Sequence, residues 1–306
     1  METKYGIISD IHRVHPDGVI NAMSVLKSKG AQKIILNGDI TGDQFPGLSE
    51  DDYLVYVLTA AGTSGLEVYV QPGSHEKVAR FEPVVRTLAS RHSNIIYTLA
   101  ERKIELPDHH LVFLPGSDWM AGDAMGQGYH FEKGDFKTGF YRTDAGHTLM
   151  ANTEDLKRYV TDPQKTIVVC HVPRKFHNPD DAVDMAYFGE SVKNFKLDGR
   201  PVEAGSVFPG PVGERLVQMG APVLMKRENR GNEDLESLYE GLGITKSVSG
   251  HFHESVHRAN DRNGRHVEPR AFANELFWNA SYMDGMKAGI LTVKDGRVAY
   301  ENVDLV

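Results

Sequence analysis

The chain has 306 residues, of which 40% are hydrophobic and 25% charged, with a formal net charge of −8 and a single cysteine, Cys170. A chain of this size can bury roughly 75% of its unfolded surface, so its core needs no disulfide or metal. The acidic balance argues against broad nucleic-acid binding, and one cysteine excludes a disulfide within the chain. With no secretory pattern at the N-terminus and no run of ~20 apolar residues, we expect a cytoplasmic protein without a membrane segment.

The first part of the chain alternates between strand-like and helix-like segments. We expect strands at residues 5–9, 33–36 and 67–70, and helices at residues 16–29, 50–63 and 78–91. Pro16 suits a first helical turn, and Gly30 suits a helix end. This βαβαβα order predicts a parallel sheet at the core.

The remainder of the chain is less regular. Three short strand-like runs at 95–97, 103–106 and 110–114 lie close enough in sequence to pair as hairpins. We expect a buried strand at 166–170, a helix at 233–241, and further strands at 247–249, 278–280, 289–293 and 298–303. The segment 116–146 indicates an elaborated loop, and residues 173–221 read as irregular. The simplest organisation is a single domain, 1–306, with insertions at about 116–150 and 173–235.

Acidic and histidine side chains directly follow five of the predicted strands. They are Asp10 and His12, Asp39, His75 with Glu76, His171, and His251 with His253. Ligands of an open α/β sheet bind beyond the carboxyl ends of its strands, so these side chains should meet at one edge. Each piece alone is weak, because Asp-x-His is a common triplet and Gly-Asp usually forms a turn. The full set in this order favours a metal site.

The chemistry of these side chains narrows the metal. Nitrogen and oxygen donors without thiolate suit manganese, iron, zinc or a mixed pair. Cys170 is interpreted as a small buried hydrophobe. The candidate ligands exceed what one tetrahedral ion uses, which indicates two ions. Two ions about 4 Å apart can clamp an in-line displacement at phosphorus and lower the pKa of a bound water.

In order and spacing, these segments resemble the signature of the calcineurin-like metallophosphoesterase superfamily. That signature reads Asp-x-His, Gly-Asp, Gly-Asn-His-Asp/Glu, His and Gly-His-x-His. Here it stands as SDIH, NGD, GSHE, CH and GHFH, from position 10 to position 253. The resemblance implies an α/β fold, a four-layer α/β/β/α sandwich with two mixed sheets, and a dinuclear metal site at one edge. It also implies hydrolysis of a phosphodiester or phosphomonoester by metal-bound hydroxide.

The resemblance also implies a role for each residue. Asp10, His12 and His253 would bind the first ion, His171 and His251 the second, and Asp39 would bridge both. His75 would lie beside the ions, either as the general acid that protonates the leaving oxygen or as a donor to a phosphoryl oxygen. A histidine suits that role because its charge changes near neutral pH.

Two positions depart from the family pattern. Ser74 replaces the asparagine whose carbonyl oxygen normally binds the second ion, and a hydroxyl is a poorer ligand, so we expect a weaker second site. Asp43 lies four residues after Asp39, where many members place an acid three residues on. Arg174, three residues after His171, is a candidate for phosphate binding at the mouth of the site, although a surface charge is the commoner role for such an arginine.

The partner indicated by these features is a small phosphorylated substrate, with nucleotides among the candidates. The aromatic residues of the 116–150 insertion could form a lid that stacks a nucleobase, or a small core of their own. Two alternatives remain. One is a nuclease resembling the double-strand-break repair nucleases, which the net charge disfavours. The other is a metal-stabilised binding scaffold without catalysis, which Ser74 keeps open.

Overall fold

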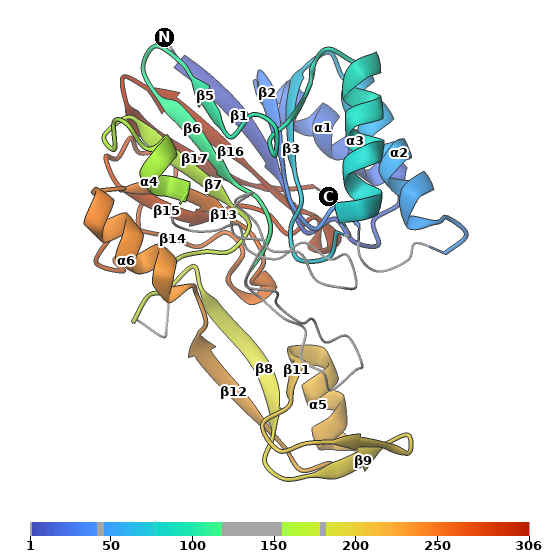
Figure 1. The fold of residues 1–306 in the computed structure, drawn as a ribbon. Helices are drawn as coiled ribbons and strands as arrows, with labels where there is room; N and C mark the ends of the chain where they lie inside the picture. The colour runs from blue at the N-terminus through green and yellow to red at the C-terminus, as the bar shows by residue number, and fades with distance from the viewer. Residues whose placement is uncertain (1, 42–45, 77, 118–154, 178–181, 306) are drawn as a thin grey trace.

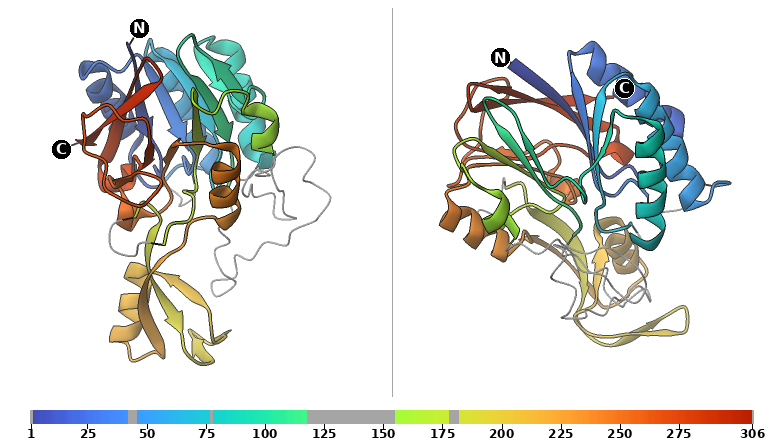
Figure 2. Two further views of the ribbon diagram at one scale, coloured as in Figure 1. Left: turned by 90° about the vertical axis from the view of Figure 1, so that its left-hand side faces the viewer. Right: turned by 45° about the horizontal axis from the view of Figure 1, so that its top comes forward.

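Two six-stranded mixed sheets pack against each other, and helices cover their outer faces (Figure 1 and Figure 2). The computed structural model describes residues 2–41, 46–76, 78–117, 155–177 and 182–305. The predicted four-layer sandwich of two mixed sheets is therefore confirmed. The predicted insertion at about 116–150 lies almost entirely outside the described residues, and so does Asp43.

The first sheet has the strand order β17-β16-β1-β2-β3-β4. Its strands are β1 (Glu2–Ile8), β2 (Lys33–Asn37), β3 (Glu67–Gln71), β4 (Ile95–Tyr97), β16 (Lys287–Lys294) and β17 (Arg297–Asp304). The strands β1, β2 and β3 are parallel, as predicted, and β4 is parallel to β3, while β16 runs antiparallel to β1 and forms a hairpin with β17. The helices α1 (Pro16–Ser28), α2 (Glu50–Thr63) and α3 (Val78–Arg91) cover its outer face (Figure 1).

The second sheet has the order β14-β15-β13-β7-β6-β5. Its strands are β5 (Lys103–Glu105), β6 (His110–Leu114), β7 (Thr166–Cys170), β13 (Lys246–Ser249), β14 (Ala259–Asn260) and β15 (Leu276–Asn279). The helices α4 (Leu156–Tyr159) and α6 (Glu233–Leu242) lie on its outer side (Figure 1). The predicted hairpin pairing holds for β5 and β6 only. The strand β4 instead joins the first sheet beside β3, because its alternating apolar side chains complete that core.

The alternation of apolar side chains explains the layers. On β2, Ile34 and Leu36 face the helices, whereas Ile35 between them faces the second sheet. On β7, Val168 packs under α6 and Val169 packs between the sheets. Successive side chains of a strand point to opposite faces, so strands that are apolar at every position are buried on both sides.

The helix ends agree with the local sequence. The Ser49 hydroxyl accepts a hydrogen bond from the Asp52 amide at 3.1 Å and so caps the start of α2. The Asn232 side chain caps α6 in the same way, accepting from the Leu235 amide at 2.7 Å. The residue after α6 is Gly243 in the left-handed conformation, φ +73°, which glycine adopts without strain.

The segment predicted to be irregular between residues 173 and 221 is folded, and that prediction is wrong. It contains β8 (Met185–Ser191), β9 (Phe195–Leu197), β10 (Arg200–Val202), β11 (Val207–Pro209) and α5 (Gly210–Gln218), and it continues into β12 (Val223–Asn229). These elements form an antiparallel sheet, β11-β8-β12, with a β9–β10 hairpin and one helix. We call residues 182–232 the appended unit, and it projects from the sandwich (Figure 1).

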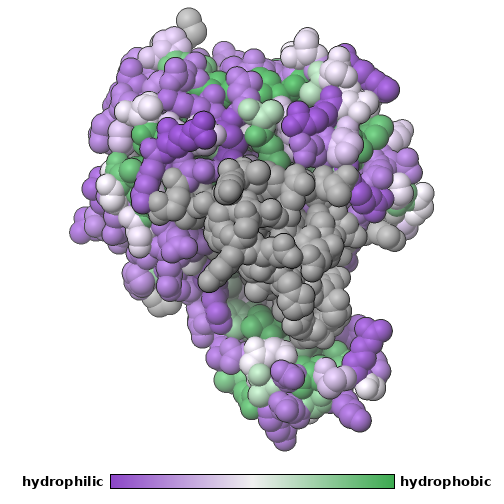
Figure 3. All heavy atoms as spheres, in the orientation of Figure 1, coloured by the Kyte–Doolittle hydropathy of each residue, from purple (hydrophilic) through white to green (hydrophobic). Residues whose placement is uncertain are grey.

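The appended unit carries a share of the exposed apolar side chains. Val192, Val217, Met219 and Leu224 are each more than 40% exposed. Apolar surface is visible on the appended unit in Figure 3. Among the described residues, no helix is both long enough and apolar enough to cross a membrane.

Candidate metal centre

The strand ends of both sheets meet at one place, as the sequence predicts. Asp10 and His12 follow β1, Asp39 follows β2, His75 follows β3, His171 follows β7, and His251 and His253 follow β13. Their donor atoms form three overlapping groups, each with its atoms within 4.8 Å of one another. The groups are Asp10–His12–His253, His12–Asp39–His75 and Asp39–His171–His251.

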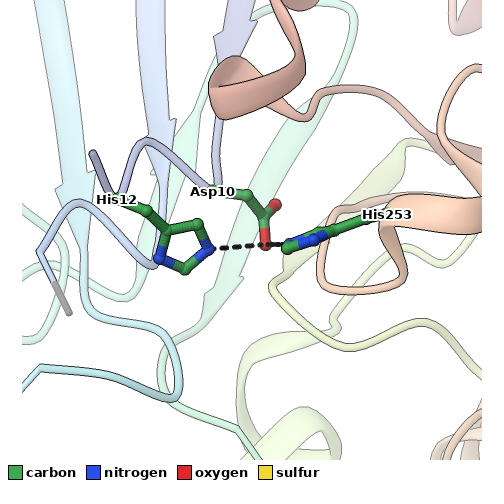
Figure 4. Close-up of side chains that lie close together, drawn as sticks. All are labelled: Asp10, His12 and His253. Carbon is green, nitrogen blue, oxygen red and sulfur yellow. Dashed lines mark hydrogen bonds and ion pairs between the residues drawn. The ribbon is translucent and has the colours of Figure 1, made fainter. Parts of the chain in front are cut away.

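The two carboxylate oxygens of Asp10 have different partners, and one of them faces His12 and His253 (Figure 4). Its Oδ2 accepts hydrogen bonds from Ser9 Oγ at 2.6 Å and from the His251 amide at 3.1 Å. Its Oδ1 lies 3.2 Å from His253 Nε2 and 4.0 Å from His12 Nε2. Burial would raise the pKa of Asp10, but His171 and His253 hold it below its usual range. One oxygen is thus fixed, and the other faces the histidines.

The two carboxylate oxygens of Asp39 also have different partners. Its Oδ1 accepts from the backbone amides of Ser74, at 2.5 Å, and His75, at 3.0 Å. Its Oδ2 lies 3.0 Å from His171 Nε2 and accepts from the Ser74 hydroxyl at 2.8 Å. Burial opposes ionisation here as well, yet His171 and His75 keep the pKa of Asp39 well below its ordinary value.

His171 is held in the orientation that a metal ligand needs. Its Nδ1 donates to the Asn37 carbonyl at 2.9 Å, which directs Nε2 toward Asp39, and this Nε2 is buried without a hydrogen-bond partner. Ligating histidines commonly have such a donor bond on their other nitrogen. Burial would lower the pKa of His171, but Asp39 and Asp10 raise it to about 10. A cation at Nε2 would satisfy the same two negative charges.

The neighbouring imidazole of His251 is neutral. Its dense surroundings and the nearby charge of His171 lower the pKa of His251 to about 3. The two rings lie edge to face with their centroids 5.1 Å apart. A neutral imidazole is the form that binds metal.

His75 lies beside the buried ligands and remains accessible. Its ring centroid is 4.9 Å from that of His12, its Nε2 is 3.9 Å from Asp39 Oδ2, and its side chain is 32% exposed. Its role as a proton donor to a substrate stays a prediction. Ser74 is buried in the same loop, and its hydroxyl donates to Asp39 in this structure. Its role as a weak ligand stays a prediction.

The backbone of the ligand loops is unusual. Asp10, His12, Asp39 and His251 all have positive φ, between +47° and +71°. A residue other than glycine in this region is strained by roughly 1–3 kcal/mol, and such residues cluster at functional sites. The loops after β1 and β13 are in close contact at Gly250. A Cβ at this position would lie 2.5 Å from Asp10 Oδ2, so only glycine fits there.

Glu76 is a site residue to which sequence reasoning gave no role. Its buried carboxylate accepts from the backbone amides of Gly73 at 2.6 Å, Thr41 at 2.9 Å and Asp39 at 3.2 Å. Burial and the charge of Asp39 raise the pKa of Glu76 to about 7. It therefore ties the loop after β3 to the loop after β2. The signal was its place as the last letter of GSHE.

Arg174, predicted to bind a substrate phosphate, has its charge paired within the protein, and its role in substrate binding stays a prediction. Its guanidinium is buried and donates to Glu236 at 3.1 Å and Glu240 at 3.2 Å on α6. It also packs over the rings of Phe176 and Phe277, 4.7 and 5.2 Å from their centroids. These contacts use the charge to hold α6 against the second sheet.

The donors fit a pair of metal ions. They are carboxylate oxygens and imidazole nitrogens that form three overlapping groups, and His171 Nε2 is a buried nitrogen with no protein hydrogen bond. Such a set suits manganese, iron or zinc. The two mixed six-stranded sheets, with this buried Asp/His cluster at their common edge, have the fold that the resemblance in the sequence implies.

Comparison with known proteins agrees at the level of the fold. No family model and no curated protein matches the chain. The solved structure of TT1561 from Thermus thermophilus has a TM-score of 0.58 at 7% identity and covers 100% of both chains. A dimetal phosphatase from Danio rerio has a TM-score of 0.45 at 11% identity, covering 99% of each chain. A purple acid phosphatase from yellow lupin, Lupinus luteus, also has 0.45 and 11%, with 100% of this chain and 52% of that one covered.

Proposed function

We propose that this chain is a metal-dependent phosphoesterase with a dinuclear centre. The observation that supports it is the overlap of the donor groups, since Asp39 belongs both to the group containing His75 and to the group containing His171. Asp10, His12 and His253 would hold the first ion, and Asp39 would bridge it to a second ion held by His171 and His251. Manganese, iron or zinc would satisfy this set.

The protein's own groups would divide the reaction between them. Bound ions supply Lewis acidity and lower the pKa of a coordinated water. The amides of Ser74 and His75 hold Asp39 in place. The partly exposed imidazole of His75 would then give a proton to the leaving oxygen of a small phosphorylated substrate, with nucleotides among the candidates.

A substrate panel tests this function. The protein is stripped of metal, Mn²⁺ is restored, and the hydrolysis of p-nitrophenyl phosphate, bis-p-nitrophenyl phosphate and single-stranded DNA is measured. We expect Mn²⁺-dependent hydrolysis of at least one of the two p-nitrophenyl esters. Asp39→Ala should abolish it, whereas His266→Ala, at a half-exposed histidine, should not change it.

Each other outcome favours a named alternative. Hydrolysis of DNA alone would favour the nuclease, and hydrolysis of none of the three would favour the metal-stabilised scaffold. Turnover that is unchanged in Asp39→Ala would contradict the site assignment itself.

A further inference from the structure

The loop between β15 and β16 lies against the first donor group, although no motif includes it. This loop contains the short helix η5 (Met283–Gly285). Its Met283 amide donates to the Ser9 carbonyl, and its Asp284 amide donates to the Asp10 carbonyl, both at 3.0 Å. The Ser281 hydroxyl accepts from the Ser9 amide at 2.9 Å. The loop is therefore fixed to the backbone that carries Asp10.

Tyr282 on this loop stacks on His253. The two rings are nearly parallel, with an interplanar angle of 12° and centroids 3.9 Å apart. The tyrosine is itself held in place, because its backbone exchanges two hydrogen bonds with Lys287, at 3.0 and 3.1 Å. Gly285 allows the close turn, since a Cβ there would lie 2.5 Å from the Tyr282 ring.

His253 is oriented differently from His171. The Nδ1 of His171 donates to the Asn37 carbonyl, and this bond fixes its ring. Among the described residues, the only hydrogen bond of the His253 ring is the one from Nε2 to Asp10 at 3.2 Å. A ligand histidine usually needs a second contact to fix its plane, and a ring stacked on its face can supply that contact.

We propose that Tyr282 is a positioning residue for the first metal site, where its ring holds the His253 imidazole with Nε2 facing Asp10. The hydroxyl is not needed for this role, since the contact is between ring faces. The inference rests on the metal centre of the proposed function but not on the reaction that the centre performs.

The test measures Mn²⁺ binding to one site at a time. The His251→Ala background removes a ligand of the second group and leaves the first complete, and the His12→Ala background does the reverse. In the first background, we expect Tyr282→Leu to weaken Mn²⁺ binding about tenfold in calorimetric titration. Tyr282→Phe should stay within about twofold, because it keeps the ring. In the second background, neither change should matter.

Matched controls separate this role from a general loss of structure. Tyr56→Leu replaces a tyrosine that is 54% exposed on α2 and should leave both sites unchanged. Circular dichroism and thermal melting check the fold of every variant. If Tyr282→Leu does not fold, Tyr282→Gln provides the same loss of the ring.

Three results would overturn the proposal. They are unchanged Mn²⁺ affinity in folded Tyr282→Leu, an equal loss in Tyr282→Phe and Tyr282→Leu, or an equal loss at both sites. Failure of the proposed function is seen separately. A wild-type protein that binds Mn²⁺ with this dependence on Tyr282, but hydrolyses no ester, contradicts the phosphoesterase and supports the positioning role.

Discussion

Each buried aspartate of the site has one oxygen that accepts two hydrogen bonds from the protein and a second oxygen that faces imidazoles; in Asp39 this second oxygen also accepts from the Ser74 hydroxyl. The oxygen with two hydrogen bonds is Oδ2 in Asp10 and Oδ1 in Asp39. A carboxylate held in this way loses little freedom when it binds a cation. These hydrogen bonds orient the carboxylates and so lower the cost of binding a cation.

His75 gives a prediction that separates its two candidate roles. If it protonates the leaving oxygen, His75→Ala should lower kcat for phenyl phosphate by about 10²–10⁴-fold, and less for p-nitrophenyl phosphate, whose leaving group needs little protonation. Metal content should stay constant, as measured by elemental analysis. An equal loss on both esters would instead favour a hydrogen bond from His75 to a phosphoryl oxygen.

His171 predicts a pH dependence of metal binding. Its pKa of about 10 lies above the ordinary 6.5, so the metal-free ring carries a proton throughout the neutral range. A cation must displace that proton, so affinity at the second group should rise with pH, by up to about one log unit per pH unit between pH 6 and 8.5. Calorimetry of the His12→Ala variant in buffers of different ionisation enthalpy would count the protons released. Metal binding without proton release would contradict the protonated state of His171.

The positive φ of His12 predicts that a glycine at this position is more stabilising than an alanine. At φ +47°, alanine is strained and glycine is not, so metal-free His12→Gly should be more stable than His12→Ala by about 1 kcal/mol in urea denaturation. Ser24, within α1, is the matched control. There the order should reverse, with alanine favoured over glycine by about 0.5–1 kcal/mol. The same order at both positions would show that His12 is not strained.

The positions of the candidate ligands could be predicted from the sequence because each directly follows a short run that reads as a strand. The roles of Arg174 and Tyr282 could not. Arg174 is neutralised by Glu236 and Glu240, and Tyr282 meets His253, pairs that are distant in sequence or carry no motif. Such contacts depend on how the layers pack, which residue types alone do not specify.

Among the elements, the loops after β2 and β3 act as one unit because Glu76 joins them. Glu76→Ala leaves three buried amides without an acceptor and should lower the free energy of unfolding by about 2–3 kcal/mol in urea denaturation. Glu76→Gln keeps one acceptor oxygen, so its free energy of unfolding should lie between those of the wild type and Glu76→Ala. Glu203→Ala, at an exposed position, is the control. A loss no larger than that of the control would show that the carboxylate does not hold the loops.

Some helices and strands could be predicted from the local sequence, and others could not. The helices α2 and α3 have the predicted bounds, because apolar spacing, and for α2 a capping serine, mark them locally. The strand β12 was missed because it reads VLMKREN, with four charged or amide residues at its end. It is a strand through pairing with β8, more than thirty residues earlier. Strand formation of this kind depends on the partner more than on local propensity.

For the whole molecule, the appended unit lies outside the ligand set but contacts it. Phe252, between the two histidines of GHFH, packs against Ala186 and Phe188 of β8. Because Ser191 pairs with Val223, residues 192–222 can be replaced by an Asn-Gly turn that keeps β8 and β12 as a hairpin. We expect this variant to bind Mn²⁺ with unchanged stoichiometry and an affinity within about threefold in calorimetric titration. Loss of a site would show that the distal part of the unit supports the ligands.

The candidate ligands belong to two different sheets. Asp10, His12 and Asp39 extend from the first sheet, while His171, His251 and His253 extend from the second. An ion held by both sets is a cross-link between the two halves of the sandwich, placed at one rim of the apolar layer that joins them. Chelation would then loosen the halves at that rim. Amide hydrogens after β2 and after β13 should begin to exchange together, although more than two hundred residues separate them in the chain.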